Sequence, residues 1–229
     1  MEYRCVQCGF GIRTLYVQYS PGNIRLMRCE NCKAVADEYI ECEIMIIAID
    51  LILQKPKAYR NLLCNVLRPE IVNFEGSLWK LCVGFLLLDA YRSLLLRKSN
   101  EEWGSSFSLS SLVWTCQRVL VDVVVGNLMF LLAFFVATRT LCNTSLTVSR
   151  CKDLLLAMLV SSYFKIFLFA MMVWEFPPSV VYIIDLYVLS SNSIALRVRT
   201  GSALNHCIAA CFTAHAVKFL APELLTFRS

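Results

Sequence analysis

Residues 119–136 read VLVDVVVGNLMFLLAFFV, an apolar run interrupted by a single charge at Asp122. A helix needs about 20 mainly apolar residues to cross the ~30 Å hydrocarbon core of a bilayer. This run approaches that length with almost no polar interruption. It therefore predicts a membrane-spanning helix.

The composition of the whole chain agrees with a membrane protein. Of its 229 residues, 58% are hydrophobic and 17% are charged, whereas soluble domains have roughly 45–50% and 25%. Mean hydropathy is +0.60. These values exclude an ordinary soluble globule and a mainly disordered chain. The 22 basic residues are spread along the sequence and form no nucleic-acid footprint, so no nucleic-acid partner is expected.

Four other segments are candidates for further spans. Leu154–Trp174 is interrupted by Lys165, and Val180–Leu196 follows a Pro177-Pro178 break. Two weaker candidates are Ala203–Ala221 and Leu78–Leu96, the second of which carries three charged residues. The sequence thus predicts a mainly α membrane protein, a polytopic helical bundle of four or five spans, with a small N-terminal zinc-ribbon-like domain.

Composition divides the chain into three parts. Residues 1–39 are polar and loop-rich, residues 40–76 are mixed, and residues 77–229 form the predicted transmembrane domain. In the middle part, Ile44–Leu53 is too short to cross a bilayer and is followed by Lys55, Lys57 and Arg60. An interfacial amphipathic helix with its basic residues toward anionic lipid is predicted. The alternative is a core helix that packs on the N-terminal domain of residues 1–39.

The distribution of basic residues predicts the orientation. The N-terminus has no apolar signal sequence. Loop 137–153 carries three basic residues and the turn at 175–178 carries none, while Arg197 and Arg199 follow the fourth span. Because short cytosolic loops are enriched in Lys and Arg, the N-terminus is expected in the cytosol.

Two C-x2-C pairs form the most specific motif in the chain. Cys5-Val6-Gln7-Cys8 and Cys29-Glu30-Asn31-Cys32 are separated by twenty residues. Two such knuckles joined by a hairpin predict a tetrahedral four-sulfur zinc site. Four thiolate ligands leave no open coordination position, so a structural zinc ion is expected. An iron–sulfur centre and a redox disulfide are the alternatives.

At these residues the chain resembles the Arv family of membrane proteins. The likeness begins with Tyr3–Cys8, continues through the second cysteine pair, and returns in Asp37–Glu41, Ala58–Asn65, Leu159–Lys165 and Val188–Asn192.

The resemblance implies an endoplasmic-reticulum membrane protein without enzymatic activity. It implies a role in sterol homeostasis and intracellular sterol or lipid transport, with effects on sphingolipid metabolism. Its partners would be membrane lipids, sterols above all. An accessory subunit for a membrane glycosyltransferase in glycolipid-anchor assembly is the alternative, and an integral-membrane enzyme is a third class.

Polar residues inside the predicted spans are candidate lipid contacts, because charges there are costly. Lys165 and Asp185 lie on neighbouring spans at depths that a lysine side chain can bridge; snorkelling, or packing of Lys165 against another segment, is the alternative. A belt of hydroxyl and amide groups lies at one depth of the same spans. It predicts a lipid-binding site or, alternatively, simple helix packing. The candidates are Ser161, Ser162, Tyr163, Lys165, Asp185, Ser190 and Asn192.

Motifs of common enzyme classes are missing from the sequence. It contains no nucleophile elbow, P-loop, dinucleotide fingerprint or HExxH motif. Single charges within spans are weak evidence for acid–base chemistry. No catalytic residue is therefore predicted.

Overall fold

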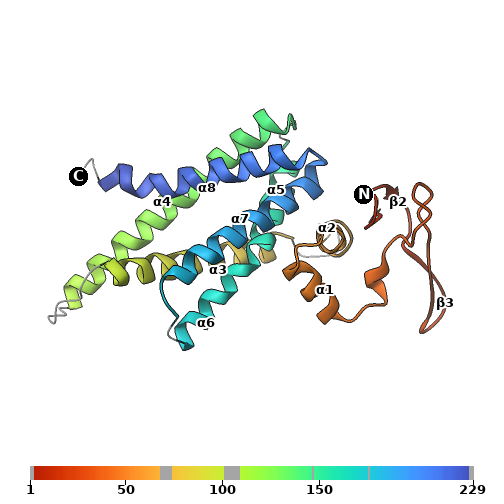
Figure 1. Cartoon of the computed structure of the whole chain (residues 1–229), viewed down its shortest axis with the longest axis horizontal. Helices are drawn as coiled ribbons and strands as arrows, with labels where there is room; N and C mark the ends of the chain where they lie inside the picture. The colour runs from red at the N-terminus through yellow and green to blue at the C-terminus, as the bar shows by residue number, and fades with distance from the viewer. Residues whose placement is uncertain (1–2, 68–73, 101–108, 146, 175, 227–229) are drawn as a thin grey trace.

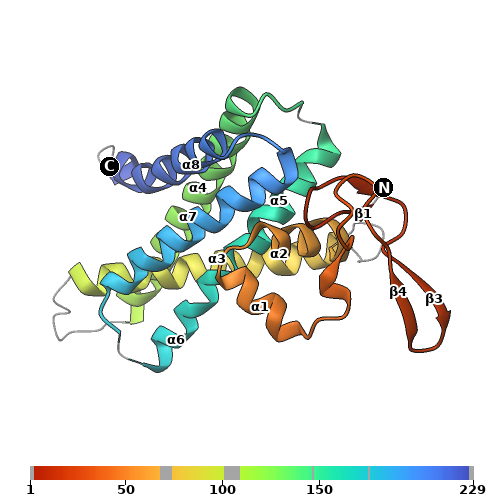
Figure 2. The same ribbon diagram turned by 45° about the vertical axis from the view of Figure 1, so that its right-hand side comes forward.

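The structure, a computed structural model, describes residues 3–67, 74–100, 109–145, 147–174 and 176–226. Short strands lie at one end of the molecule and long helices make up the other (Figure 1). A group of short helices, α1 and α2 among them, lies between the two parts (Figure 2). The predicted helical protein with a small N-terminal domain is confirmed in this architecture.

Two antiparallel hairpins form the N-terminal domain. Strand β1 (Tyr3–Arg4) pairs with β2 (Gly11–Ile12), and β3 (Tyr16–Ser20) pairs with β4 (Asn23–Leu26). Gly22 adopts a positive φ of 83° in the turn between β3 and β4, a conformation that favours glycine. Every residue of β3 is exposed, so this hairpin buries little apolar surface. A domain this small and open needs additional stabilisation, such as a bound metal ion.

Four short helical segments connect this domain to the long helices. They are η1 (Glu38–Ile40), α1 (Ile44–Ile52), α2 (Pro56–Arg60) and the π-helical η2 (Asn61–Val66). Helix α1 forms where the sequence predicts it, and none of its residues is buried. Ile47 and Leu51 pack partly against Tyr39 and its neighbours. Its exposed large apolar residues are Ile44, Met45, Ile46, Ile49 and Ile52. An interfacial position for α1 stays a prediction.

The basic residues that follow α1 have partners within the protein. Lys55 donates to Asp50 at 2.7 Å and Lys57 pairs with Glu38 at 3.1 Å. Arg60 donates to the carbonyl groups of two residues in the metal domain. Their local role is therefore to hold the connecting helices and the hairpins together, in addition to any contact with lipid.

The helical domain consists of α3 (Phe74–Asn100), α4 (Leu109–Leu141), α5 (Val148–Ser161), the short α6 (Phe167–Val173), α7 (Ser179–Thr200) and α8 (Leu204–Thr226). A 3-10 turn, η3 (Ser162–Ile166), joins α5 to α6. Within the described residues, three helical stretches are long and apolar enough to cross a bilayer: Val113–Leu141, Val148–Met171 and Ser179–Thr200. These match the three strongest sequence predictions, and a count of four or five stays a prediction.

The break between α5 and α6 has a local cause. The Ser162 hydroxyl donates to the Met158 carbonyl at 2.7 Å, and the Ser161 hydroxyl lies 3.2 Å from the same oxygen. Serine hydroxyls that compete for the carbonyl of an earlier turn bend or tighten a helix. The predicted span at 154–174 consequently consists of two helices and a tight turn, within a stretch that is long and apolar enough to cross a bilayer.

Small side chains allow α8 to approach α4 closely. Cys207, Ala210, Cys211 and Ala214 are fully buried and lie in one cluster with Phe130 and other apolar residues of α4. Their spacing places them on one face of α8. Packing of small residues drives helix association in membranes, where lipid is as apolar as leucine. These two cysteines are thus packing residues of the helical domain.

Candidate functional site

The two cysteine pairs form matching backbone turns. In the first, the Gly9 amide donates to the Cys5 carbonyl at 2.8 Å. In the second, the Lys33 amide donates to the Cys29 carbonyl at 2.9 Å. Gly9 and Lys33 occupy the same place after their pairs, and both have positive φ, 81° and 60°. The C-x2-C spacing therefore specifies the same tight turn twice.

The four sulfur atoms converge on one point. All lie within 4.8 Å of one another, with 3.7 Å between Cys5 and Cys32 and 3.6 Å between Cys8 and Cys29. An ion bound tetrahedrally at ~2.3 Å from each sulfur requires sulfur–sulfur distances of about 3.8 Å, whereas a disulfide requires about 2.05 Å. All four are free thiols. The geometry fits a metal ion enclosed by four thiolates.

The electrostatics of the cluster favour a bound cation. Burial raises the pKa of the Cys5 thiol to about 12. The pKa of Cys8 is lowered to about 6, because burial, which opposes ionisation, is outweighed by hydrogen bonds from the Phe10 backbone and the Cys29 thiol. Four adjacent thiols cannot all ionise alone, since their charges repel. A metal ion removes this repulsion as the thiolates form.

A buried carboxylate fastens the metal domain to η2. Asp37 is fully buried and accepts hydrogen bonds from the Asn61 and Asn65 side chains at 2.8 and 2.7 Å. Asn65 also exchanges two hydrogen bonds with the backbone of Arg4, at 2.9 and 3.0 Å. The Tyr39 amide donates to Asp37 at 3.1 Å. Metal domain and helical connector therefore form one hydrogen-bonded unit.

The same connector contacts the membrane helices. Tyr59 of α2 is buried and shares a 2.7 Å hydrogen bond with Ser191 of α7. The Tyr163 hydroxyl donates to the Leu51 carbonyl at 2.7 Å, and Ser190 donates to Gln54 at 2.6 Å. These contacts link the predicted polar belt to α1 and the loop that follows it. Two of the predicted lipid contacts thus have partners in the connector.

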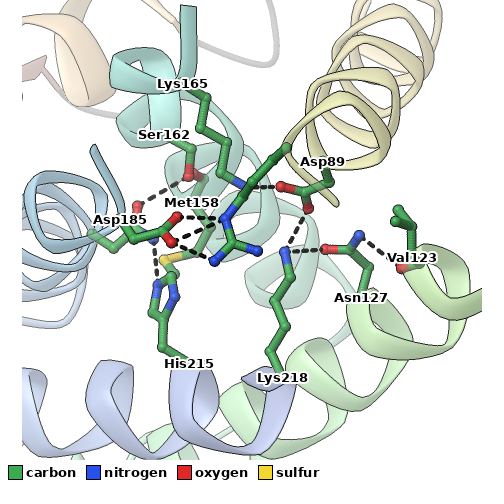
Figure 3. A network of polar contacts seen from close by, with 11 residues as sticks. Asp89, Val123, Asn127, Met158, Ser162, Lys165, Asp185, His215 and Lys218 are labelled. Atoms are coloured by element: carbon green, nitrogen blue, oxygen red, sulfur yellow. Dashed lines mark hydrogen bonds and ion pairs between the residues drawn. The ribbon is translucent and has the colours of Figure 1, made fainter. Parts of the chain in front are cut away.

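Deeper in the helical domain, charged side chains from three helical segments converge (Figure 3). Asp89 of α3 bonds to Lys165 of η3 and Lys218 of α8, both at 2.5 Å. Lys218 also donates to Asn127 of α4 at 2.9 Å. Asp89 and Lys165 have side chains that are 3% and 4% exposed. Such a cluster offsets the cost of placing each charge away from water.

Asp185 has a different partner from the one the sequence predicted. It accepts hydrogen bonds from Arg92 of α3, with Nε 3.0 and 2.9 Å from its two oxygens, and the Nη2 group also bonds to it. Lys165 therefore does not bridge the difference in depth to Asp185 but pairs with Asp89, which agrees with the alternative that it packs against another segment. The reason is that α3 lies against both spans and supplies a charge of each sign. Arg92 is the better bidentate partner for a carboxylate.

The predicted polar belt joins helices to one another. Ser161 donates to the Asn192 side-chain oxygen at 2.6 Å, and the Ser162 hydroxyl lies 3.3 Å from the same oxygen. The Asn192 amide lies 3.3 Å from the His215 ring nitrogen of α8, and Ser191 donates to the Ser161 carbonyl at 2.6 Å. The arrangement supplies the helix-packing role considered for the belt. Lipid contact by these residues stays a prediction.

Lys218 is the member of the charged cluster that sequence reasoning missed. It lies in α8, whose sequence is otherwise mainly apolar up to that position. A lone charge in an apolar segment was already a signal, because it requires a partner. Asp89 is one of the three charged residues in the weaker candidate span Leu78–Leu96. Its partners are 76 and 129 residues away in sequence, and no local pattern predicts such pairs.

An apolar pocket of about 190 Å³ lies beside this cluster, between α3, α4 and α5. Its walls include Phe85, whose ring centroid is 3.7 Å from the Lys165 ammonium group, and Leu128. Asn127 and Ser162 contribute the polar groups of the lining. A pocket of this size holds part of a lipid molecule and not a whole one. Among the predicted lipid contacts, Ser162 lines it.

Comparison with known proteins identifies the relatives of this chain. Residues 4–196 match the Arv1-like family. A protein of Arabidopsis thaliana named ARV 1 is 54% identical over 223 residues, which cover 97% of this chain and 89% of the relative. ARV1 of Mus musculus is 33% identical, covering 86% of this chain and 73% of the relative. The arv1 protein of Schizosaccharomyces pombe is 29% identical, covering 87% and 76%. No solved structure matches the chain. The matched length and these identities show that the chain belongs to the Arv1-like family.

Proposed function

We propose that this protein acts in sterol homeostasis and intracellular sterol or lipid transport, with effects on sphingolipid metabolism, and without enzymatic activity. Membership of the Arv1-like family supports a membrane protein of this kind. The names of the relatives specify no reaction. The observation that carries the proposal furthest is the apolar pocket between α3, α4 and α5.

The pocket has the chemistry that a sterol or acyl chain requires. Phe85, Leu128 and other apolar side chains supply nearly all of its surface. Ser162 lies at its wall, but its hydroxyl donates to the Met158 carbonyl, so the pocket suits the apolar part of a lipid. Leu128 is 56% exposed, so the pocket opens beside a helix face that the proposal places against lipid. A ligand can therefore enter from the bilayer.

We further propose that the metal ion is structural zinc, held by Cys5, Cys8, Cys29 and Cys32. Tetrahedral coordination by four sulfur ligands is typical of zinc, with iron as the competing metal. The ion would close both knuckles and supply the folding free energy that the open hairpins lack.

The proposed location is the endoplasmic-reticulum membrane, with the metal domain in the cytosol. Reducing conditions there keep thiols available as metal ligands. The segments that follow α4 and α7, at 142–145 and 201–203, lie beside the metal domain, and basic residues predict a cytosolic position for them.

Photo-crosslinking with a sterol probe tests the lipid proposal. Leu128→Trp places a large ring in the pocket, whereas Leu132→Trp adds the same ring one turn further along α4. Leu132 is 62% exposed and does not line the pocket. We expect Leu128→Trp to lower crosslinking by about tenfold or more, corresponding to about 1.4 kcal/mol of binding free energy, and Leu132→Trp to leave it unchanged.

Equal crosslinking of wild type and both variants would contradict binding in this pocket. If the protein also purified in a stable complex with a membrane glycosyltransferase, the accessory-subunit function would replace the lipid-transport proposal. Turnover of a lipid substrate by the purified protein alone would contradict the absence of enzymatic activity.

A further inference from the structure

A second pocket, of about 870 Å³, lies where the metal domain meets the ends of the long helices. Its walls come from the β1–β2 hairpin, from η2, and from the turns that connect α4 to α5 and α7 to α8. We call it the Arg199 pocket, after the arginine in the last turn of α7. The turns follow two of the candidate membrane spans, so the pocket lies at the level of lipid headgroups.

The lining of the Arg199 pocket is rich in positive charge. Arg4, Arg150 and Arg199 contribute guanidinium groups, and Asp153 contributes a carboxylate. Hydroxyl groups of several serines and threonines complete the polar part of the wall. Among the residues that the structure describes, the charged side chains of the lining therefore sum to a net positive charge, which favours an anion.

Arg199 supplies a specific signal for a ligand. Its Nε and Nη2 atoms are both buried, and neither has a hydrogen-bond partner among the residues that the structure describes. These two N–H groups form one edge of the guanidinium group, the edge that binds carboxylate or phosphate oxygens in a bidentate manner. Buried donors without partners are rare because they are costly.

The first turn of α5 adds further donors. Thr147 is the N-cap of this 14-residue helix but makes no side-chain cap hydrogen bond. The first backbone N–H groups of a helix have no partner within the helix, and its dipole favours negative charge there. Thr147, Ser149 and Arg150 all line the pocket. The N-terminus of α5 and Arg199 therefore line the same pocket.

We propose that the Arg199 pocket binds a phosphate group with net negative charge, carried by an anionic lipid headgroup or by a soluble phosphate compound. A tetrahedral phosphate accepts hydrogen bonds from the guanidinium edge, amides and hydroxyl groups in several directions at once, whereas a planar carboxylate has two oxygens. The site does not depend on the proposed sterol function, because a sterol carries no phosphate. It would join the metal domain to the membrane surface through one ligand.

Binding of two probes to the purified full-length protein tests the proposal. The probes are short-chain phosphatidate and inorganic phosphate, and the variants are Arg199→Gln and Arg197→Gln. Arg197 is exposed, lies two residues earlier on α7 and does not line the pocket. Its variant therefore removes the same charge without changing the lining of the pocket. We expect Arg199→Gln to weaken phosphate binding by about tenfold or more, through loss of a bidentate charge-assisted pair, and Arg197→Gln to bind as wild type.

The two probes distinguish the sources of the phosphate. Binding of phosphatidate without competition from inorganic phosphate assigns the pocket to a lipid headgroup, and binding of both assigns it to phosphate compounds generally. Metal content and melting temperature report whether each variant folds. If Arg199→Gln does not fold, Arg150→Gln, which changes an exposed side chain of the same pocket, takes its place. Failure of wild type to bind either probe, or equal binding by wild type and the pocket variant, overturns the proposal.

Discussion

At the scale of single residues, the charged cluster around Asp89 determines how the helices fit together. One carboxylate contacts two lysines from different segments, and a neighbouring pair joins Arg92 to Asp185. The groups total two negative and three positive charges. Removing one partner of a buried pair costs more than replacing both by apolar groups, because it leaves a charge uncompensated. This asymmetry is testable.

We expect Asp89→Asn to destabilise the protein by about 3–5 kcal/mol, because Lys165 then stays buried without its counter-charge. The double variant Asp89→Leu with Lys165→Met should lose less. As a control, Lys57→Gln removes an exposed pair with Glu38 and should cost below about 1 kcal/mol. Unfolding in detergent measures all three. A double variant less stable than Asp89→Asn would contradict the ion pair.

At the scale of elements, the two knuckles act as one unit with the connector. The hairpins bury little, but their cysteines meet at one point and Asp37 fastens them to η2. Loss of one thiolate therefore affects more than one turn. It would remove a ligand of the proposed ion, which would hold both knuckles, and loosen the surface on which α2 and η2 rest.

Metal analysis of cysteine variants checks this dependence. We expect wild type to contain one metal ion per chain, and Cys29→Ser to lose the ion and the fold of the N-terminal domain, because four thiolates are needed to enclose it. Cys82→Ser should keep both, since Cys82 lies in α3 outside the cluster. Full metal content in Cys29→Ser, or none in wild type under reducing conditions, would exclude a four-cysteine site.

At the scale of the whole molecule, the fold places the metal domain beside particular turns. The hairpin around Gly9 and the turns after α4 and α7 line one pocket, so they lie on one side of any membrane that these helices cross. The turn between α6 and α7 begins the return path of α7 and belongs to the opposite side. Topology can therefore be tested at few positions.

Labelling in intact microsomes with a membrane-impermeant maleimide, followed by peptide mapping, tests this topology. We expect Ser145→Cys and Ser202→Cys to react from the cytosolic side, because their turns lie with the metal domain. Pro178→Cys should react only after the membrane is opened. Reaction of Pro178→Cys in sealed microsomes, with protection of Ser145→Cys, would reverse the orientation and expose the cysteine cluster to oxidising conditions.

The sequence alone predicted the membrane class, the three strongest spans, a short helix at 44–53 and the four cysteines that the structure brings together. Hydropathy adds up along a chain, and a C-x2-C turn is a local structure, so both can be read without the fold. Only the tertiary structure decided which acid meets Lys165, that Lys218 joins the same cluster, and that Arg199, with two unpartnered nitrogen atoms among the described residues, lines a shared pocket. These contacts join residues from 76 to more than 100 positions apart. Such pairings depend on how helices pack against one another. A charged residue in an apolar span indicates that a partner exists, but the local sequence does not show which residue that partner is.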